Sequence, residues 1–300
     1  LMHTSYSQQA NIEFPEIGAV MAKYLGRDGT GLPQFVKISS QGNTGAGFLG
    51  PKYQPFSLNH SGRLPPFSSN NLDDERDERR HALRGFLEER YAERHKAVTS
   101  KMHREANEAA RRLVGSRKAF EIDDEWPKFQ DLYGDSLFGR RCLMARKLIE
   151  SGVAFVEVGQ SGYDTHADNF RGHKGLVPPM DHAWAGLLTD LEQRGLLDKT
   201  LVVWMGEIGR TPRINNRAGR DHYVKTWSAA LAGCGVKAGY VHGRSDDRGI
   251  DVAQDPVTEG DFFATVYSAL GVNPALENYA GVRPIPLAPF GSKAVKDILA

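Results

Sequence analysis

The sequence predicts an α/β fold. Two apolar runs, residues 153–158 and 200–205, are typical of buried strands, and a segment with apolar residues three and four positions apart lies between them. Strand, helix and strand at this spacing predict a βαβ unit with parallel strands and a right-handed crossover. With 300 residues, 40% of them hydrophobic and 25% charged, the chain can bury the core of one large domain, which we place at residues 1–300.

The first 70 residues are rich in glycine and proline. A short helix is predicted over residues 15–25, ending at Gly26, and a strand over residues 35–38. Residues 39–70 contain the stretches GNTGAGFLG and RLPPFSSNN, which favour an ordered excursion or a substrate-facing loop over regular structure.

Residues 71–116 form a charged segment dense in helix formers, which we predict to be a helical excursion from the domain. Asn71 is the expected N-cap of its first helix. Because the acidic and basic residues alternate, the segment is typical of a solvated helix face and not of an arm that binds nucleic acid. A structural or interaction role for this segment is a third functional hypothesis, beside the two given below.

Three further helices are predicted after residue 135. One runs from Ser136 to Ser151, one carries apolar residues from Met180 and ends at Gly195, and one begins at Thr258. Thr258 and Asp261 have the spacing of a capping box.

Composition indicates that any anionic partner must be held by a local site and not by the overall charge of the chain. The formal net charge is +1, so no overall field recruits nucleic acid or an anionic membrane. No apolar run approaches the roughly 20 residues of a membrane span. Cys142 and Cys234 form no CxxC pair, and we expect both to be small buried residues instead of a disulfide.

The candidate chemistry lies in the loops that follow the two predicted strands, because ligands of parallel sheets bind beyond the carboxyl ends of the strands. The first loop, GQSGYDTHADN, places Asp164 and His166 two residues apart. In an extended segment both side chains project to one side. The second loop, GEIGRTPRINNRAGRDHY, holds the remaining acidic, basic and imidazole candidates: Glu207, Arg210, Arg213, Arg220, Asp221 and His222.

These loops supply a mixed oxygen and nitrogen donor set that suits a divalent metal ion. The five candidate ligands are Asp164, His166, Glu207, Asp221 and His222. The ion could be Zn, Mn, Ca or Mg. Arg210 is the candidate for neutralising a phosphoryl or sulfuryl group, and with Glu207 it makes up the predicted catalytic pair.

Alternatives remain open for each motif. A single Asp-x-His is common in Asx turns with a solvated imidazole, and Glu207 alone could cap a helix beside Arg210. Other histidines near these loops are candidates for ligands or for groups that support ligands: His173, His182 and His242.

Several long segments resemble the domain of unknown function 1501 family: SGYDTHADN, LLTDLEQRGLLDKTLVVWMGEIGRTPRIN, GRDHY, AALAGCGVKAGYVHGRSDDRG and PVTEGDFFATVYSALGV. The likeness continues upstream through FPEIGAVMAKYLG, LPQFVKIS and YGDSLFGRRCLMARKLIESGVAFVEV. Asp164 and His166 match a WDTH-like motif in which Tyr163 replaces Trp, while Glu207 and Arg210 match GEFGRTP with Ile208 replacing Phe. Two residues match the GRDH motif: Asp221 and His222.

The resemblance implies the fold of the alkaline phosphatase and sulfatase superfamily, a three-layer sandwich with a mostly parallel central sheet. It also implies metal-bound Asp and His side chains and a Ser, Thr or formylglycine nucleophile. The superfamily places that nucleophile after an early strand that we expect to precede Leu1, so the N-terminal portion of the domain is expected to be lacking. Thr4, Ser5 and Ser7 are weaker candidates for the nucleophile. Family members often carry an export signal, which implies a periplasmic or exported protein.

Two functional hypotheses from different classes follow from these features. The first is a metal-dependent hydrolase of sulfate or phosphate esters, acting on a small-molecule or polysaccharide ester. The second is a non-catalytic protein that binds carbohydrate or an anionic polymer and keeps the fold with an incomplete nucleophile site.

Overall fold

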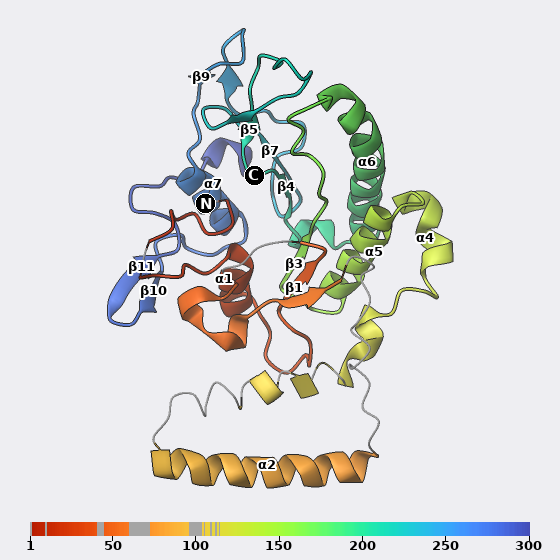
Figure 1. Cartoon of the computed structure of the whole chain (residues 1–300), viewed down its shortest axis with the longest axis vertical. Helices are drawn as coiled ribbons and strands as arrows, with labels where there is room; N and C mark the ends of the chain where they lie inside the picture. Colours follow the sequence, from red (N-terminus) through yellow and green to blue (C-terminus); the bar gives the residue numbers. More distant parts are fainter. Residues whose placement is uncertain are drawn as a thin grey trace.

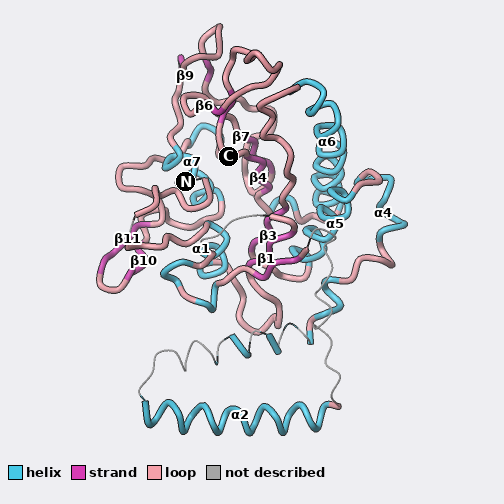
Figure 2. Tube along the Cα trace, in the orientation of Figure 1, coloured by secondary structure: helices cyan, strands magenta, loops and turns pink. Residues whose placement is uncertain are grey.

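The computed structural model describes residues 2–9, 11–40, 45–59, 73–95, 104, 106–108, 110–111, 113 and 115–300. The molecule is a mixed α/β structure (Figures 1 and 2). The described α-helices are α1 (Ile17–Tyr24), α2 (Asp74–His95), α4 (Trp126–Tyr133), α5 (Leu137–Glu150), α6 (Asn169–Gln193) and α7 (Glu259–Ala269). Short 3-10 turns occur at Gly47–Leu49, Pro51–Tyr53, Arg117–Phe120, Leu197–Lys199 and Lys296–Ile298.

One sheet of the described chain is parallel, with strand order β2-β1-β3. The other described strands pair two by two and antiparallel: β4 with β7, β5 with β6, β8 with β9, and β10 with β11. The strands are β1 (Phe35–Ile38), β2 (Phe56–Leu58), β3 (Phe155–Val158), β4 (Val202–Met205), β5 (Gly209–Arg210), β6 (His222–Tyr223), β7 (Ala229–Ala232), β8 (Arg244–Ser245), β9 (Val252–Gln254), β10 (Glu277–Ala280) and β11 (Arg283–Pro286).

Helices cover both faces of the parallel sheet (Figure 1). Side chains alternate between the faces of a strand, so Val36 and Ile38 of β1 pack in one core cluster with Leu143 and Leu148 of α5. Phe35 points the other way, and its ring meets Phe155 edge to face at 5.4 Å between centroids. A second cluster joins α1 to α7 on that side. The parallel sheet therefore lies between α5 on one face and α1 on the other.

The predicted pairing of residues 153–158 with residues 200–205 is wrong. β3 pairs with β1, in the register Val36 to Val156, whereas β4 pairs antiparallel with β7, in the register Val203 to Leu231. The sequence did not predict β7 because its residues, AALA, lack the branched and aromatic side chains that favour strands. β4 is also less buried than expected, since Val203 and Trp204 are 36% and 39% exposed.

The predicted helices are present, with some different boundaries. Ser136 accepts a hydrogen bond from Gly139 N at the start of α5, and Thr258 and Asp261 form the capping box of α7. α6 begins at Asn169 and continues through Pro178 and Pro179, so it starts well before Met180, the first residue of the predicted apolar pattern. Each of its two interior prolines lacks the N–H that would donate within the helix, and α6 packs along α4 and α5.

The charged segment contains α2 and further helical residues between 104 and 115. Asp73 caps α2, because its Oδ1 accepts a hydrogen bond from Arg76 N at 2.8 Å. Asn71, the expected cap, lies outside the described residues, as does part of the excursion at residues 39–70. β2 arises within that excursion and was not predicted. Within the described residues, no helix combines the length and the apolarity that a membrane span needs.

Candidate metal centre

The candidate site is built by the loops that leave β3 and β4. The first loop, residues 159–168, runs from β3 into α6, and the second, residues 206–223, contains β5 and β6. In this two-residue antiparallel pair, Arg210 lies directly opposite His222. Gly209 allows the pairing, since a Cβ there would lie 1.6 Å from Thr226 O. The strands from which the two loops leave, β3 and β4, are not hydrogen-bonded neighbours in the described sheets.

Backbone hydrogen bonds join the two loops. Arg217 O accepts from Asp168 N at 3.0 Å, and Thr165 O accepts from Arg220 N at 3.1 Å. Gly219 approaches the first loop so closely that a Cβ would lie 2.1 Å from the carbonyl of His166. Any larger residue at position 219 would push the loops apart, so this glycine sets the distance between the two groups of side chains.

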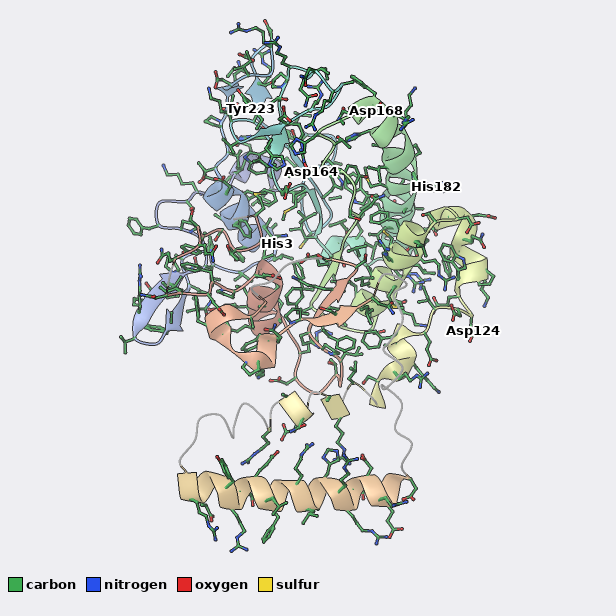
Figure 3. All side chains as sticks on the ribbon, viewed as in Figure 1. His3, Asp124, Asp164, Asp168, His182 and Tyr223 are labelled. Atoms are coloured by element: carbon green, nitrogen blue, oxygen red, sulfur yellow. The ribbon has the colours of Figure 1, made fainter. Side chains whose placement is uncertain are left out.

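Three nitrogen atoms converge on one carboxylate oxygen. Asp164 Oδ1 lies 2.6 Å from Arg210 Nη1, 2.9 Å from His222 Nε2 and 3.0 Å from His166 Nε2. The rings of His166 and His222 are 4.9 Å apart between centroids. Asp164 lies between the parallel sheet and the outer loops (Figure 3). Asp164, His166 and His222 each offer a ligand atom, and the three atoms lie within 4.8 Å of one another.

The second nitrogen of His166 also faces a carboxylate. Its Nδ1 lies 2.8 Å from Asp221 Oδ1. A neutral imidazole carries one proton and can donate to only one of these two carboxylates. The other contact then needs either a second proton or a cation between nitrogen and oxygen. With the proton on Nδ1, Asp221 orients the ring and the lone pair of Nε2 points towards Asp164, as in histidines that bind metals.

Asn215 holds this arrangement and was not identified from the sequence. Its Nδ2 donates to both carboxylate oxygens of Asp221, at 3.2 and 3.3 Å, and to His166 O at 3.1 Å. Its Oδ1 accepts from Arg217 N and Gly219 N, both at 2.9 Å. The available signal was the sequence NNRAG, because an asparagine often closes a turn on the backbone that follows it.

The carboxylates of the site are held ionised. The hydrogen bond from Arg210, followed by that from His222, lowers the pKa of Asp164 from 3.8 to about 2. The pKa of Asp221 is also lowered, chiefly by its hydrogen bond with His166 and then by that with Asn215. Both side chains are solvent-accessible, at 57% and 50%. The site thus presents negative charge to solvent at neutral pH.

The remaining predicted residues have different positions. Glu207 is 70% exposed, and its Oε1 lies 3.7 Å from Arg210 Nη2 and 3.9 Å from His222 Nε2. It lies at the edge of the site, outside the group of three ligand atoms. Arg220 donates to the carbonyl oxygens of Thr211 and Pro212, so its guanidinium supports the loop.

The histidines beyond the two loops have other contacts. His173 Nδ1 lies 2.9 Å from Asn169 O within α6, and His182 Nε2 lies 3.0 Å from Asp131 O. The early hydroxyls have other partners, since Thr4 donates to Tyr6 O and the buried Ser5 donates to Leu287 O at the far end of the chain. These contacts give the four side chains structural roles.

A second group with metal-ligand atoms consists of His3, Glu16 and Glu157. Glu16 forms an ion pair with Lys37, and both side chains are almost fully buried. The ammonium group of Lys37 therefore already supplies the positive charge that a metal ion would bring, in a place closed to solvent. Arg210 pairs with Asp164 in a similar way, but the ligand side chains of the Asp164 site are accessible to solvent. An ion there would be open to water or substrate, so the Asp164 site is the stronger candidate.

The model of the family described as "Protein of unknown function (DUF1501)" matches residues 1–299. The chain belongs to this family. No curated protein and no solved structure matches it. As a DUF1501 protein, the chain carries the three family-like motifs on the two loops that meet at Asp164. The family description itself assigns no activity.

Proposed function

We propose that the protein binds a divalent metal ion through Asp164, His166 and His222 and hydrolyses sulfate or phosphate esters. The observation that carries the proposal is the double contact of His166, whose two ring nitrogens each face a carboxylate. A cation bound between His166 Nε2 and Asp164 would make this contact favourable without a second proton on the ring. The single proton of the imidazole then stays on Nδ1 and is donated to Asp221. Asp221 is thus an orienting group in this proposal, and Glu207 is not a ligand.

The donor set narrows the choice of metal. Two imidazoles and one carboxylate are typical of zinc, manganese and iron sites with open positions, whereas calcium and magnesium are bound mainly by oxygen. When bound, such an ion acts as a Lewis acid and lowers the pKa of a coordinated water. We therefore favour zinc or manganese over calcium or magnesium.

Arg210 and Glu207 complete the proposed chemistry. A cation beside Asp164 would compete with the guanidinium of Arg210 for the carboxylate. Arg210, whose Nη1 and Nη2 contact Asp164 and Glu207, could then turn to hold the oxyanion of a sulfate or phosphate group in a two-pronged contact. In this proposal the exposed carboxylate of Glu207, at the edge of the site, takes up a proton from water.

The proposed fold relationship supports the same chemistry. We infer that the β2-β1-β3 sheet, covered by helices on both faces, is part of a three-layer sandwich like that of alkaline phosphatases and sulfatases. The Asp164 loop leaves the carboxyl end of β3, where open α/β sheets bind their ligands.

The test combines metal analysis with ester cleavage. Elemental analysis of the purified protein is expected to find a bound divalent ion, and aryl sulfates or aryl phosphates are expected to be cleaved. His166→Ala should abolish both results. His182→Ala is the matched control, because His182 lies on α6 away from Asp164 (Figure 3) and should leave metal and turnover unchanged.

Two outcomes would decide against the hydrolase. The proposed metal site would be contradicted if the purified protein held no divalent ion and His166→Ala cleaved the esters as fast as the unmodified protein. A bound ion with retention on sulfated polysaccharide, but without cleavage of any ester, would instead support the non-catalytic binding protein.

A further inference from the structure

Helix α2 turns acidic side chains towards the rest of its chain and apolar side chains towards solvent. Asp77 and Glu88 lie on one side of the helix and are only 22% and 15% exposed. Asp77 contacts Arg111 at 3.8 Å and Glu88 contacts Arg104 at 3.9 Å, which ties this polar side to the helical residues that follow α2 in the chain. The side of α2 that faces its own chain is therefore the side that carries Asp77 and Glu88.

The apolar residues of α2 lie on the other side and are exposed to solvent. Leu83, Phe86, Leu87 and Tyr91 are 60%, 54%, 57% and 53% exposed. At 3.6 residues per turn they cover roughly 140° of the helix circumference. A surface helix normally turns such a stripe towards the core of its domain. Here the stripe faces outwards, and α2 lies at one end of the molecule, apart from α1 and β1 (Figure 1).

Arginines share this outward side. Arg76 and Arg90 lie seven residues before and after Leu83, and Arg80 and Arg94 lie seven residues before and after Leu87. Residues seven apart lie on nearly the same side of a helix, so all four arginines share the side of the two leucines. Each of the four is exposed. Arg90 also lies over the ring of Phe86, 5.4 Å from its centroid. The acidic residues occupy other sides of the helix, for example Glu78 and Glu89. The near-neutral charge of α2 thus conceals a face that is both apolar and cationic.

This combination disfavours a second copy of the chain as the partner. A paired copy would bury Arg76 and Arg90 at the same positions as Leu83, and Arg80 and Arg94 at the same positions as Leu87, whereas helix pairs need apolar residues at those positions. An anionic lipid surface accepts both kinds of side chain. Apolar residues enter the boundary between headgroups and acyl chains, while arginine stems extend along the apolar surface to reach the phosphates.

We propose that the exposed face of α2 docks on the surface of an anionic phospholipid membrane. The face is defined by its four apolar residues, Leu83, Phe86, Leu87 and Tyr91, and its four arginines, Arg76, Arg80, Arg90 and Arg94. The docked helix lies in the plane of the interface and does not cross the bilayer. The inference is independent of the chemistry proposed for Asp164, and it gives the charged segment an interaction role.

Co-sedimentation of the full chain with vesicles tests the proposal. The protein should bind vesicles of phosphatidylcholine mixed with phosphatidylglycerol and should bind vesicles of pure phosphatidylcholine much more weakly. Leu83→Ser with Leu87→Ser should weaken binding by more than about tenfold, since two buried leucines are lost. Arg76→Gln with Arg90→Gln should weaken it by about fivefold for each charge.

The matched control is Glu78→Gln with Glu89→Gln, two exposed residues outside the docking face whose replacement should not weaken binding. Three results would overturn the proposal. They are the absence of binding to both kinds of vesicle, equal binding by the double leucine variant, and a dimer in solution that the double leucine variant dissociates. The last result, measured by light scattering, would assign the face to a second copy.

Discussion

Two clusters of charged side chains in this protein use similar contacts in opposite surroundings. In the first, Asp190 accepts hydrogen bonds from Tyr133 at 2.7 Å, Arg146 at 2.9 Å and Arg194 at 2.6 Å. Arg146 is 1% exposed and Asp190 is 3% exposed. In the second, Asp164 has three contacts of similar length, 2.6, 2.9 and 3.0 Å, but is 57% exposed.

The difference lies in how the charges are satisfied. The Arg146 cluster joins α4, α5 and α6, and its three cations match its three carboxylates: Arg146, Lys147 and Arg194 with Glu125, Glu150 and Asp190. Around Asp164, two of the three donors are imidazoles, which become neutral when they lose a proton. The Arg146 cluster, with balanced charges and a buried centre, holds three helices together. The Asp164 cluster is open to solvent, and a metal ion can replace a proton on one of its imidazole nitrogens.

The largest expected effect comes from the Arg146 cluster. Arg146→Ala leaves the buried carboxylate of Asp190 without this partner, so the free energy of unfolding should fall by about 3–5 kcal/mol. Arg117→Ala is the control, because Arg117 and Glu121 form an exposed pair that should contribute less than about 1 kcal/mol. Denaturant unfolding measures both. Equal losses in the two variants would show that burial does not separate the clusters.

In the open cluster, Asp221→Asn should change binding and not stability. The asparagine no longer supplies the charge that keeps the proton on Nδ1 of His166, so metal affinity should fall about 10–100-fold. Asp246→Asn is the control, since Asp246 also accepts backbone hydrogen bonds, including one from Ile250 N at 2.7 Å, but in a separate turn. Competition with a zinc chelator gives the affinities, and an unchanged value for Asp221→Asn would remove its orienting role.

Asn215→Ala should produce a smaller loss, about tenfold in metal affinity, because Asp221 keeps its charge but loses its support. Asn273 offers a close comparison. Its side chain accepts a hydrogen bond from Ala275 N in another exposed turn. Asn273→Ala therefore removes the same kind of side-chain-to-backbone hydrogen bond at a place away from the site. If both variants bind metal as tightly as the unmodified protein does, Asn215 only closes its loop.

The sequence predicted local elements better than long-range pairings. The apolar runs of β1, β3 and β4 and the caps of α5 and α7 are local features, and each lies where its residues indicated. The antiparallel partner of β4 depends on AALA, a segment without a strand signal of its own. Composition also could not show that the polar side of α2 faces the chain, because that depends on contacts with Arg104 and Arg111.

The same distinction applies to the candidate site. Asp164, His166, Arg210 and His222 were predicted because their types and spacings are visible in two short motifs. Asn215 contributes through a loop that folds back on His166, which no spacing reveals. Glu207 was grouped with the ligands by its place after β4, yet the pairing of β5 with β6 leaves it at the edge.

The smallest effect concerns the charge balance at Asp164 itself. Arg210→Gln removes the main cause of its lowered pKa, which should rise from about 2 towards 3.8 in the metal-free protein. Because the folded pKa is lowered, ionised Asp164 stabilises the fold above pH 3.8, and this contribution is lost as the pH falls through about 2. Solvent screening makes the stability change slight. A carbon NMR titration of the carboxyl group measures the pKa, and Arg213→Gln serves as the control. An unchanged pKa in Arg210→Gln would mean that the imidazoles alone hold the carboxylate, and the open cluster would then need no arginine to stay ionised.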